Sequence, residues 1–202
     1  MSDDAPTTDD VHRAAAAIRD GDAVVYPTET VYGMGADATS PAAVERVFDI
    51  KGRDRDKPLS AGFPDVDSAL DYVEVTDREE AFMRRFLPGP VTVVVERRDS
   101  LPDVLVSGRD RVGVRVPDHE LALELFRAAE TPVTATSANL SGAGSITNPS
   151  QLPDEIRDAV AAVLDGGTTP GTESTVVDPG QGIIHRHGAM ADDIEAWLEA
   201  ES

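Results

Sequence analysis

The chain has 202 residues, of which 40% are hydrophobic, and this is enough for one α/β domain with a substantial core. Its 38 Asp and Glu residues against 18 Lys and Arg residues give a net charge of −20. That charge argues against tight direct binding of nucleic acid, which needs cations to displace counterions. The absence of cysteine excludes a disulfide framework, a thiolate nucleophile and a cysteine-ligated zinc site.

The acidic residues are spread over the whole chain, and arginine greatly outnumbers lysine. This composition is typical of halophilic proteins, because high intracellular salt screens the repulsion between like charges. Residues 1–10 are polar, and no stretch reaches the ~20 apolar residues of a membrane helix. We therefore expect a cytoplasmic protein with no membrane partner.

The first half of the chain mixes helical and extended patterns after a polar segment, residues 1–8, that we predict to be a disordered N-terminal tail. Thr76 and Glu79 form a capping box, which marks the start of one helix. The elements predicted in chain order are a helix over 9–20, a strand over 23–26, a loop over 28–37, a helix over 41–50, a strand over 58–63, a helix over 65–72 and a helix over 77–86.

The second half of the chain continues the same mixture, and its run VTVVVE at residues 91–96 is the clearest strand. The elements that follow it are a strand over 112–116, a helix capped by Asp118 that runs to 129, a strand over 132–136, a loop over 137–149, a short helix near 154, strands over 160–164, 174–178 and 182–186, and a helix over 191–201. Strands and helices alternate without a break in composition, so the fold class is α/β, a single domain with a mixed sheet.

The segment KGRDRDK at residues 51–57 holds both lysines of the chain, Lys51 and Lys57, together with Arg53 and Arg55. Lysine supplies a mobile point charge that suits a phosphate which must be held and released, and arginine supplies a planar fork. The segment therefore predicts an anion site, and a solvated charged loop is the alternative.

Hydroxyl and amide side chains follow two of the predicted strands, where open α/β sheets place their ligands. Thr30 lies in the first of these loops, and Ser137, Asn139 and Ser145 lie in the second. Each loop either orients a small polar substrate or only bonds its own backbone. The second loop lacks the spacing of a P-loop.

Arg115 stands inside an otherwise apolar strand, and Arg186 ends another strand beside two histidines. Each arginine either grips a carboxylate or phosphate of a ligand or points to a solvated face. No histidine spacing predicts a protein-built metal site, and no nucleophile or general base is evident. These residues suit the binding of a nucleotide and a small amino acid, with catalysis by proximity and charge neutralisation.

Seven sequence blocks in order resemble the YrdC/TsaC-type threonylcarbamoyl-AMP synthases in their single-domain form, over residues 22–189. The blocks are YPTETVYGMGADA (26–38), KGRDRDKPL (51–59), LPGPVTVVVE (87–96), VGVRVPDH (112–119), TSANLSGAGSITNP (136–149), ESTVVD (173–178) and HRHGA (185–189). Any one block is a weak signal, whereas seven in order are specific.

The resemblance implies a YrdC-like catalytic domain over residues 9–202, in which a twisted mixed sheet encloses a basic cavity. It implies a nucleotidyltransferase that forms threonylcarbamoyl-AMP and pyrophosphate from L-threonine, bicarbonate or CO₂, and ATP accompanied by Mg²⁺. That product is the first intermediate in the threonylcarbamoyladenosine modification of tRNA, so a separate tRNA threonylcarbamoyl transferase complex would be the downstream partner.

The resemblance also assigns roles to residues. Thr30, Arg115 and Ser174 would bind threonine, and Lys51, Arg53 and Lys57 would carry catalysis. The residues implied on the ATP side are Arg53, Lys57, Ser137, Asn139, Ser145 and Arg186, and none of the residues is implied as a metal ligand.

One departure from the family pattern concerns threonine selectivity, because many relatives carry a histidine where this chain has Gly62. The alternative function is therefore a nucleotide- or RNA-binding protein of the same fold without synthase activity. The charge of −20 counts against the RNA-binding form of that alternative.

Overall fold

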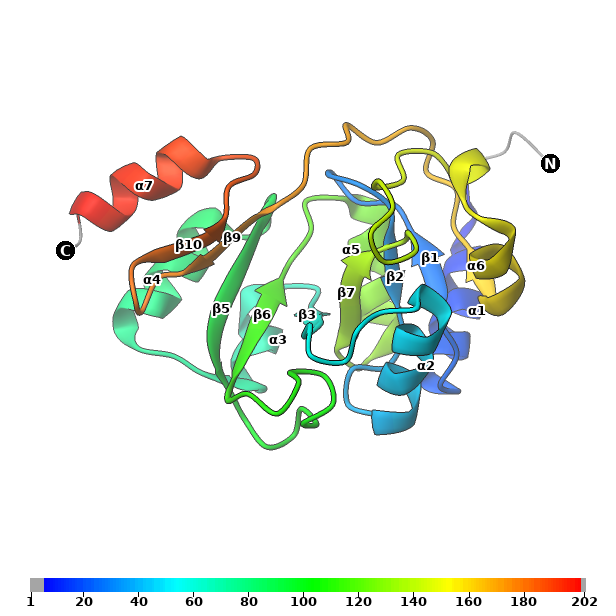
Figure 1. The fold of residues 1–202 in the computed structure, drawn as a ribbon, viewed down its shortest axis with the longest axis horizontal. Coiled ribbons are helices and arrows are strands. Elements are labelled where there is room, and N and C mark those ends of the chain that lie inside the picture. The colour runs from blue at the N-terminus through cyan, green and yellow to red at the C-terminus, as the bar shows by residue number, and fades with distance from the viewer. Residues whose placement is uncertain (1–5, 201–202) are drawn as a thin grey trace.

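A mixed sheet organises the computed structural model, which describes residues 6–200 (Figure 1). Its strand order is β10-β9-β5-β6-β3-β7-β2-β1-β8, and β4 pairs with β5 outside this path. The strands are β1 (Val24–Tyr26), β2 (Gly33–Gly35), β3 (Ser60–Gly62), β4 (Val73–Glu74), β5 (Val91–Arg97), β6 (Arg111–Arg115), β7 (Val133–Ser137), β8 (Ala162–Val163), β9 (Thr175–Asp178) and β10 (Ile183–Arg186).

Three strand pairs are parallel, namely β1 with β8, β3 with β6 and β5 with β9, and the other named pairs are antiparallel. The prediction of a mixed sheet is therefore confirmed. The helices are α1 (Thr8–Arg19), α2 (Pro41–Lys51), α3 (Val66–Leu70), α4 (Asp77–Phe86), α5 (Glu120–Ala129), α6 (Asp154–Ala159) and α7 (Ala191–Ala200), with a short 3₁₀ helix at Pro149–Gln151.

The helices cover the sheet in separate groups. Helices α1 and α5 pack together over β1 and form one apolar cluster around Ile18 and Phe126. Helix α7 lies beside α4 at the opposite end of the molecule (Figure 1), where Trp197 meets the rings of Phe82 and Phe86. No helix within residues 6–200 combines the length and apolarity that crossing a bilayer requires.

The helix ends follow the local sequence closely. Thr7 caps α1 through a capping box with Asp10, so Thr7 and Thr8 belong to the folded domain rather than to the predicted tail. Residues 1–5 of that tail lie outside the described residues. Thr76 and Glu79 form the predicted capping box of α4. The prediction for α5 was wrong by one residue, because His119 occupies the N-cap and makes no side-chain cap bond.

The loop predicted over residues 28–37 was wrong in part, since it contains strand β2, whose residues are all buried. This strand pairs antiparallel with β1, and its glycines make room for the ring of Tyr26. A Cβ atom would lie 2.8 Å from that ring at Gly33 and 2.9 Å from it at Gly35. The glycines that resembled loop residues in the sequence are therefore required by close packing within the sheet.

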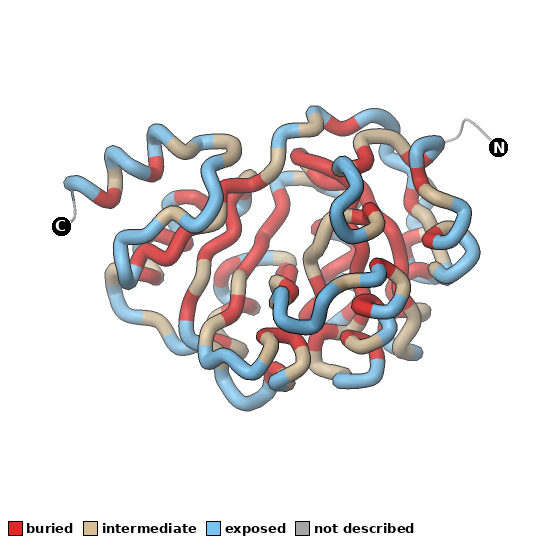
Figure 2. The backbone as a smooth tube through the Cα atoms, viewed as in Figure 1, coloured by how far each residue is buried: buried red, intermediate tan, exposed pale blue. Residues whose placement is uncertain are grey.

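Alternation along the strands separates an apolar core from a polar face. On β5, Val91, Val93 and Val95 are buried among the apolar side chains of the larger core cluster. Thr92 of β5 lines a cavity instead, and so does Arg115 of the neighbouring strand β6. The inner strands are buried along most of their length, as Figure 2 shows in red. The sheet therefore presents polar and charged side chains to the cavity from buried backbone.

Candidate functional site

A cavity of about 580 Å³ lies over the polar face of the sheet. Residues from β3, β5, β6, β7, β9 and β10 contribute to its wall, together with the loop between β1 and β2. Five arginines line it against two carboxylates, so its charge is positive in a strongly acidic protein. The charged lining residues are Arg53, Arg109, Arg111, Arg115, Arg186, Glu173 and Asp178.

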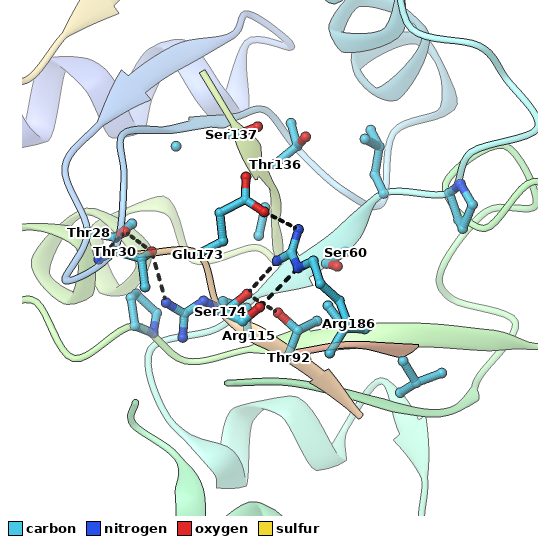
Figure 3. A pocket seen from close by; sticks show the side chains of 18 of the residues that line it. Thr28, Thr30, Ser60, Thr92, Arg115, Thr136, Ser137, Glu173, Ser174 and Arg186 are labelled. Atoms are coloured by element: carbon cyan, nitrogen blue, oxygen red, sulfur yellow. Dashed lines mark hydrogen bonds and ion pairs between the residues drawn. The ribbon is translucent and has the colours of Figure 1, made fainter. Parts of the chain in front are cut away.

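Two threonine hydroxyls stand at one end of the cavity (Figure 3). Thr28 Oγ1 donates to the Val31 carbonyl at 2.6 Å and accepts from the backbone N–H groups of Thr30 and Val31. The Thr30 hydroxyl lies 2.8 Å from the Thr28 hydroxyl. The tight loop is thus held by Thr28, and Thr30 is the residue that it directs toward the cavity.

Arg115 lies beside Thr30 and is almost fully buried, with 8% of its side chain exposed. Its Nη1 donates to the carbonyls of Gly89 and Val91, and its Nη2 donates to Glu29 Oε1 at 2.7 Å. A longer contact of 3.5 Å joins Nη2 to Thr30 Oγ1. The sequence left open whether Arg115 faces solvent, and the structure buries it in the cavity wall.

A second arginine, Arg186, reaches the middle of the cavity from β10 (Figure 3). Its Nη2 donates to Ser174 Oγ at 3.0 Å, and that hydroxyl is also 3.0 Å from Thr92 Oγ1. Its Nη1 lies 3.0 Å from Glu173 Oε2, and the other oxygen of Glu173 accepts from Ser145 Oγ at 2.7 Å. Glu173 therefore links Arg186 to the long loop after β7.

Lys51 is the last residue of α2, and only 2% of it is exposed. Its ammonium group donates to the carbonyls of Ser137 and Asn139, so it fixes the start of the loop after β7. Burial, with a smaller contribution from the nearby Arg53 charge, lowers the pKa of Lys51 from 10.5 to about 8. This lysine is placed to position the loop rather than to meet a ligand directly.

The other cations of the basic segment point in different directions. Arg53 lines the cavity, while its Nε and Nη2 donate to the carbonyls of Lys57 and Pro58. Arg55 turns outward to Glu45 and Asp49 on α2. Lys57 is exposed, and its ammonium group contacts no partner among the described residues.

The structure thus brings together six of the predicted site residues as lining residues of one cavity, namely Thr30, Arg53, Arg115, Ser137, Ser174 and Arg186. Lys51, Lys57, Asn139 and Ser145 do not line it. The amide N–H groups of the Asn139 side chain donate to the carbonyls of Leu140 and Ala143, so Asn139 stabilises its own loop. Ser145 reaches the cavity only through its bond to Glu173.

The sequence analysis missed several charged residues of the wall. Arg111 Nη2 donates to Asp178 Oδ1 at 2.8 Å and to Glu79 Oε1 at 3.1 Å, and both carboxylates are buried. The available signal was the alternation on β6, which puts residue 111 on the same face as Arg115. Arg109 donates to the Asp56 carbonyl. Because Arg109 precedes β6, the alternation on that strand could not indicate that it lines the cavity.

Gly62 faces the ring of Phe126, which also lines the cavity. A Cβ atom at residue 62 would lie 2.7 Å from that ring. A histidine at this position would therefore require the ring to move, so Phe126 fills space that a larger residue 62 would need.

A family model described as "Telomere recombination", for the Sua5, YciO and YrdC proteins, matches residues 16–188. The threonylcarbamoyl-AMP synthase of Pyrococcus abyssi is 41% identical over 169 residues, which cover 82% of this chain and 49% of that protein. The human threonylcarbamoyl-AMP synthase is 35% identical, over 95% of this chain and 72% of its own length.

The crystal structure of P. abyssi Sua5 complexed with L-threonine superposes with a TM-score of 0.90 at 36% identity, covering 96% of this chain and 58% of that one. The chain thus spans only about half to three fifths of the length of this P. abyssi protein. The YciO protein of E. coli shares the fold, with a TM-score of 0.83 at 24% identity over 92% of each chain. The chain belongs to the Sua5/YciO/YrdC family.

Proposed function

We propose that this protein is an L-threonylcarbamoyladenylate synthase, a nucleotidyltransferase that acts on L-threonine, bicarbonate or CO₂, and ATP. The observation that carries this proposal is one cavity lined by Thr30, Arg115 and Ser174 on the threonine side and by Arg53, Ser137 and Arg186 on the nucleotide side, with the hydrogen bond from Arg186 to Ser174 where the two sides meet. The named relatives, one of them solved with L-threonine, support the same choice of substrate and product.

The proposed reaction has two bond-forming steps. The free amine of threonine attacks CO₂ to give a carbamate and a proton, or attacks bicarbonate to give a carbamate and water. A carbamate oxygen then attacks the α-phosphorus of ATP, and the bond from that phosphorus to the bridging oxygen breaks to release pyrophosphate. Proximity in one cavity supplies much of the rate, since the carbamate has a short life in water.

The cations would offset the charge that develops on the phosphates. We assign this role to Arg53 and Lys57, with Arg186 on the nucleotide and Lys51 holding the loop of Ser137, Asn139 and Ser145. Residues 6–200 contain no group of three His, Asp or Glu side chains suited to a metal ion. We propose that Mg²⁺ enters with ATP, on phosphate oxygens and water.

The product would leave for a partner, because threonylcarbamoyl-AMP is an intermediate in the modification of tRNA. We propose that a tRNA threonylcarbamoyl transferase complex in the cytoplasm takes it. Direct tight binding of tRNA is not expected from a chain with a net charge of −20.

Pyrophosphate release from ATP in molar KCl with Mg²⁺ tests the proposal. We expect release that requires both L-threonine and bicarbonate, and L-serine in place of threonine measures selectivity at the end of the cavity near Gly62. Failure to release pyrophosphate by a folded preparation that binds ATP would favour a nucleotide-binding protein of this fold without synthase activity.

A further inference from the structure

The five arginines that line the cavity differ in whether a carboxylate neutralises them. Arg111, Arg115 and Arg186 each form an ion pair, at 2.8, 2.7 and 3.0 Å. Arg53 and Arg109 form no ion pair with any residue that the structure describes, and their side chains donate only to backbone carbonyls. Because a carbonyl carries no net charge, these two guanidinium groups keep their positive charge available for a ligand.

The topology of the sheet brings Arg53 and Arg109 to the same end of the cavity. Strands β3 and β6 are parallel neighbours, so the segments that lead into them enter the sheet side by side. The two segments are in contact, because the Leu59 N–H donates to the Leu105 carbonyl at 2.8 Å. Strand β7 runs antiparallel to β3, so its last residue, Ser137, lies at this end as well. The two unpaired arginines therefore lie on the nucleotide side of the cavity.

Hydrogen bonds hold Arg109 in place and leave most of its donors unused. Its Nη2 donates to the Asp56 carbonyl at 3.2 Å, and its own carbonyl accepts from Arg97 Nε at 3.0 Å. Nε and Nη1 of Arg109, and Nη1 of Arg53, have no partner among the described residues. The planar N–H groups of a guanidinium match the oxygens of a phosphate in a bidentate contact. Both arginines thus keep the donors that a phosphate needs.

The distance from the threonine side decides which phosphates of ATP these arginines can meet. The five-residue strand β6 separates the Cα atoms of Arg111 and Arg115 by about 13 Å, at roughly 3.3 Å per residue step. Arg109 precedes this strand, at the end away from Arg115. In the proposed reaction the carbamate of threonine attacks the α-phosphorus, so the α-phosphate lies next to threonine. The β- and γ-phosphates can then extend along β6 toward Arg109.

We propose that Arg109 binds the β- and γ-phosphates of ATP together with Arg53, which deepens the proposed function and rests on it. Arg109 belongs to the loop between β5 and β6, so the phosphate side of the cavity is built from two segments and not from the basic segment alone. Negative charge moves onto the departing pyrophosphate as its bond to the α-phosphorus breaks. Arginines that hold these phosphates therefore stabilise the leaving group as well as the bound nucleotide.

Titration calorimetry with ATP and with AMP, both in Mg²⁺ and 1 M KCl, tests this role. We expect Arg109→Gln to reduce the preference for ATP over AMP by a factor on the order of 10 to 100, because a charge-assisted contact with the β- and γ-phosphates is lost. The screening length at 1 M salt is about 3 Å, so only a direct contact keeps its effect. Arg85→Gln removes the same charge from an exposed residue of α4 outside the cavity and should leave the preference unchanged.

Two further variants separate phosphate binding from support of the loop. Arg109→Lys keeps the charge and should retain part of the preference. Ser107→Ala removes another bond between the two segments, from Ser107 Oγ to the Arg55 carbonyl, and should leave the preference unchanged. Equal weakening of ATP and AMP in Arg109→Gln, or the same loss of preference in Ser107→Ala, would mean that Arg109 only supports the loop.

An unchanged preference in Arg109→Gln would mean that this residue meets no phosphate. Each of these results overturns the inference and leaves the proposed function standing, because the wild type still binds ATP. A folded wild-type protein that binds neither nucleotide overturns the proposed function, and this inference with it.

Discussion

The side chains of the basic segment show how far residue type alone predicts position. Two lysines and two arginines in seven residues indicated an anion site, and Arg53 does line the cavity. Arg55 turns outward to α2, and Lys51 is buried against two carbonyls. Spacing could not separate these roles, because the left-handed turn at Gly52 changes the direction of every side chain after it.

Lys57 gives the first prediction. Lys57→Ala should lower kcat/KM for ATP roughly 30- to 1,000-fold, or about 2–4 kcal/mol of transition-state stabilisation, by analogy with other preorganised donors. The ammonium group is exposed without a described partner, so it can extend to a phosphate. Arg55→Ala, in the same segment, is the matched control and should change kcat/KM less than twofold. A loss below tenfold for Lys57→Ala would remove Lys57 from the proposed site.

Lys51 gives a prediction about pH. Burial lowers its pKa to about 8 in the folded state, against 10.5 when exposed. Between these values the unfolded chain binds more protons, so the free energy of unfolding rises with pH. Relative to Lys51→Met, the wild type should gain up to roughly 3 kcal/mol between pH 8 and 10.5. Urea unfolding of both proteins across this range measures it, and a constant difference would show that the pKa of Lys51 is not lowered.

At the level of elements, the helices and the valine-rich strand β5 could be predicted because local pattern and burial agree. Strand β2 could not be predicted in this way, because its glycines are required by close packing against the ring of Tyr26, which lies on another strand. The pairing of Arg111 with Glu79 was hidden for a similar reason. In the sequence, Glu79 can be recognised only as part of a capping box. Its second carboxylate oxygen, Oε1, accepts from Arg111 of β6, and only the fold brings these two residues together.

This double use of Glu79 gives a prediction for α4. Oε2 accepts from the backbone N–H and the hydroxyl of Thr76, and Oε1 accepts from Arg111. Glu79→Ala should therefore lower the free energy of unfolding by about 2–4 kcal/mol, since it removes both the cap and a charge-assisted bond. Thr76→Ala removes the cap alone and should cost about 1 kcal/mol. Equal losses in urea unfolding would mean that the contact with Arg111 contributes nothing.

At the level of the whole molecule, seven ordered sequence blocks were enough to predict a mixed sheet and to indicate which loops meet. They could not predict that Arg115 and Arg186 are both neutralised by glutamates, because each pair joins segments that the fold alone brings together. The cavity nevertheless keeps a net positive charge inside a chain with a net charge of −20, because five arginines line it against two carboxylates. Any anionic ligand of the cavity must therefore approach through a repulsive field.

That repulsion leads to the last prediction, a melting temperature that rises with KCl into the molar range. The screening length falls from about 10 Å at 0.1 M to about 3 Å at 1 M, so salt removes repulsion among the surface carboxylates. Salt also weakens surface ion pairs such as that of Arg84 with Asp67, but exposed pairs contribute little. With 38 acidic residues against 18 basic ones, repulsion is the larger effect. Thermal unfolding followed by circular dichroism in 0.1–3 M KCl measures it, and a melting temperature that stays flat or falls would refute the halophilic interpretation.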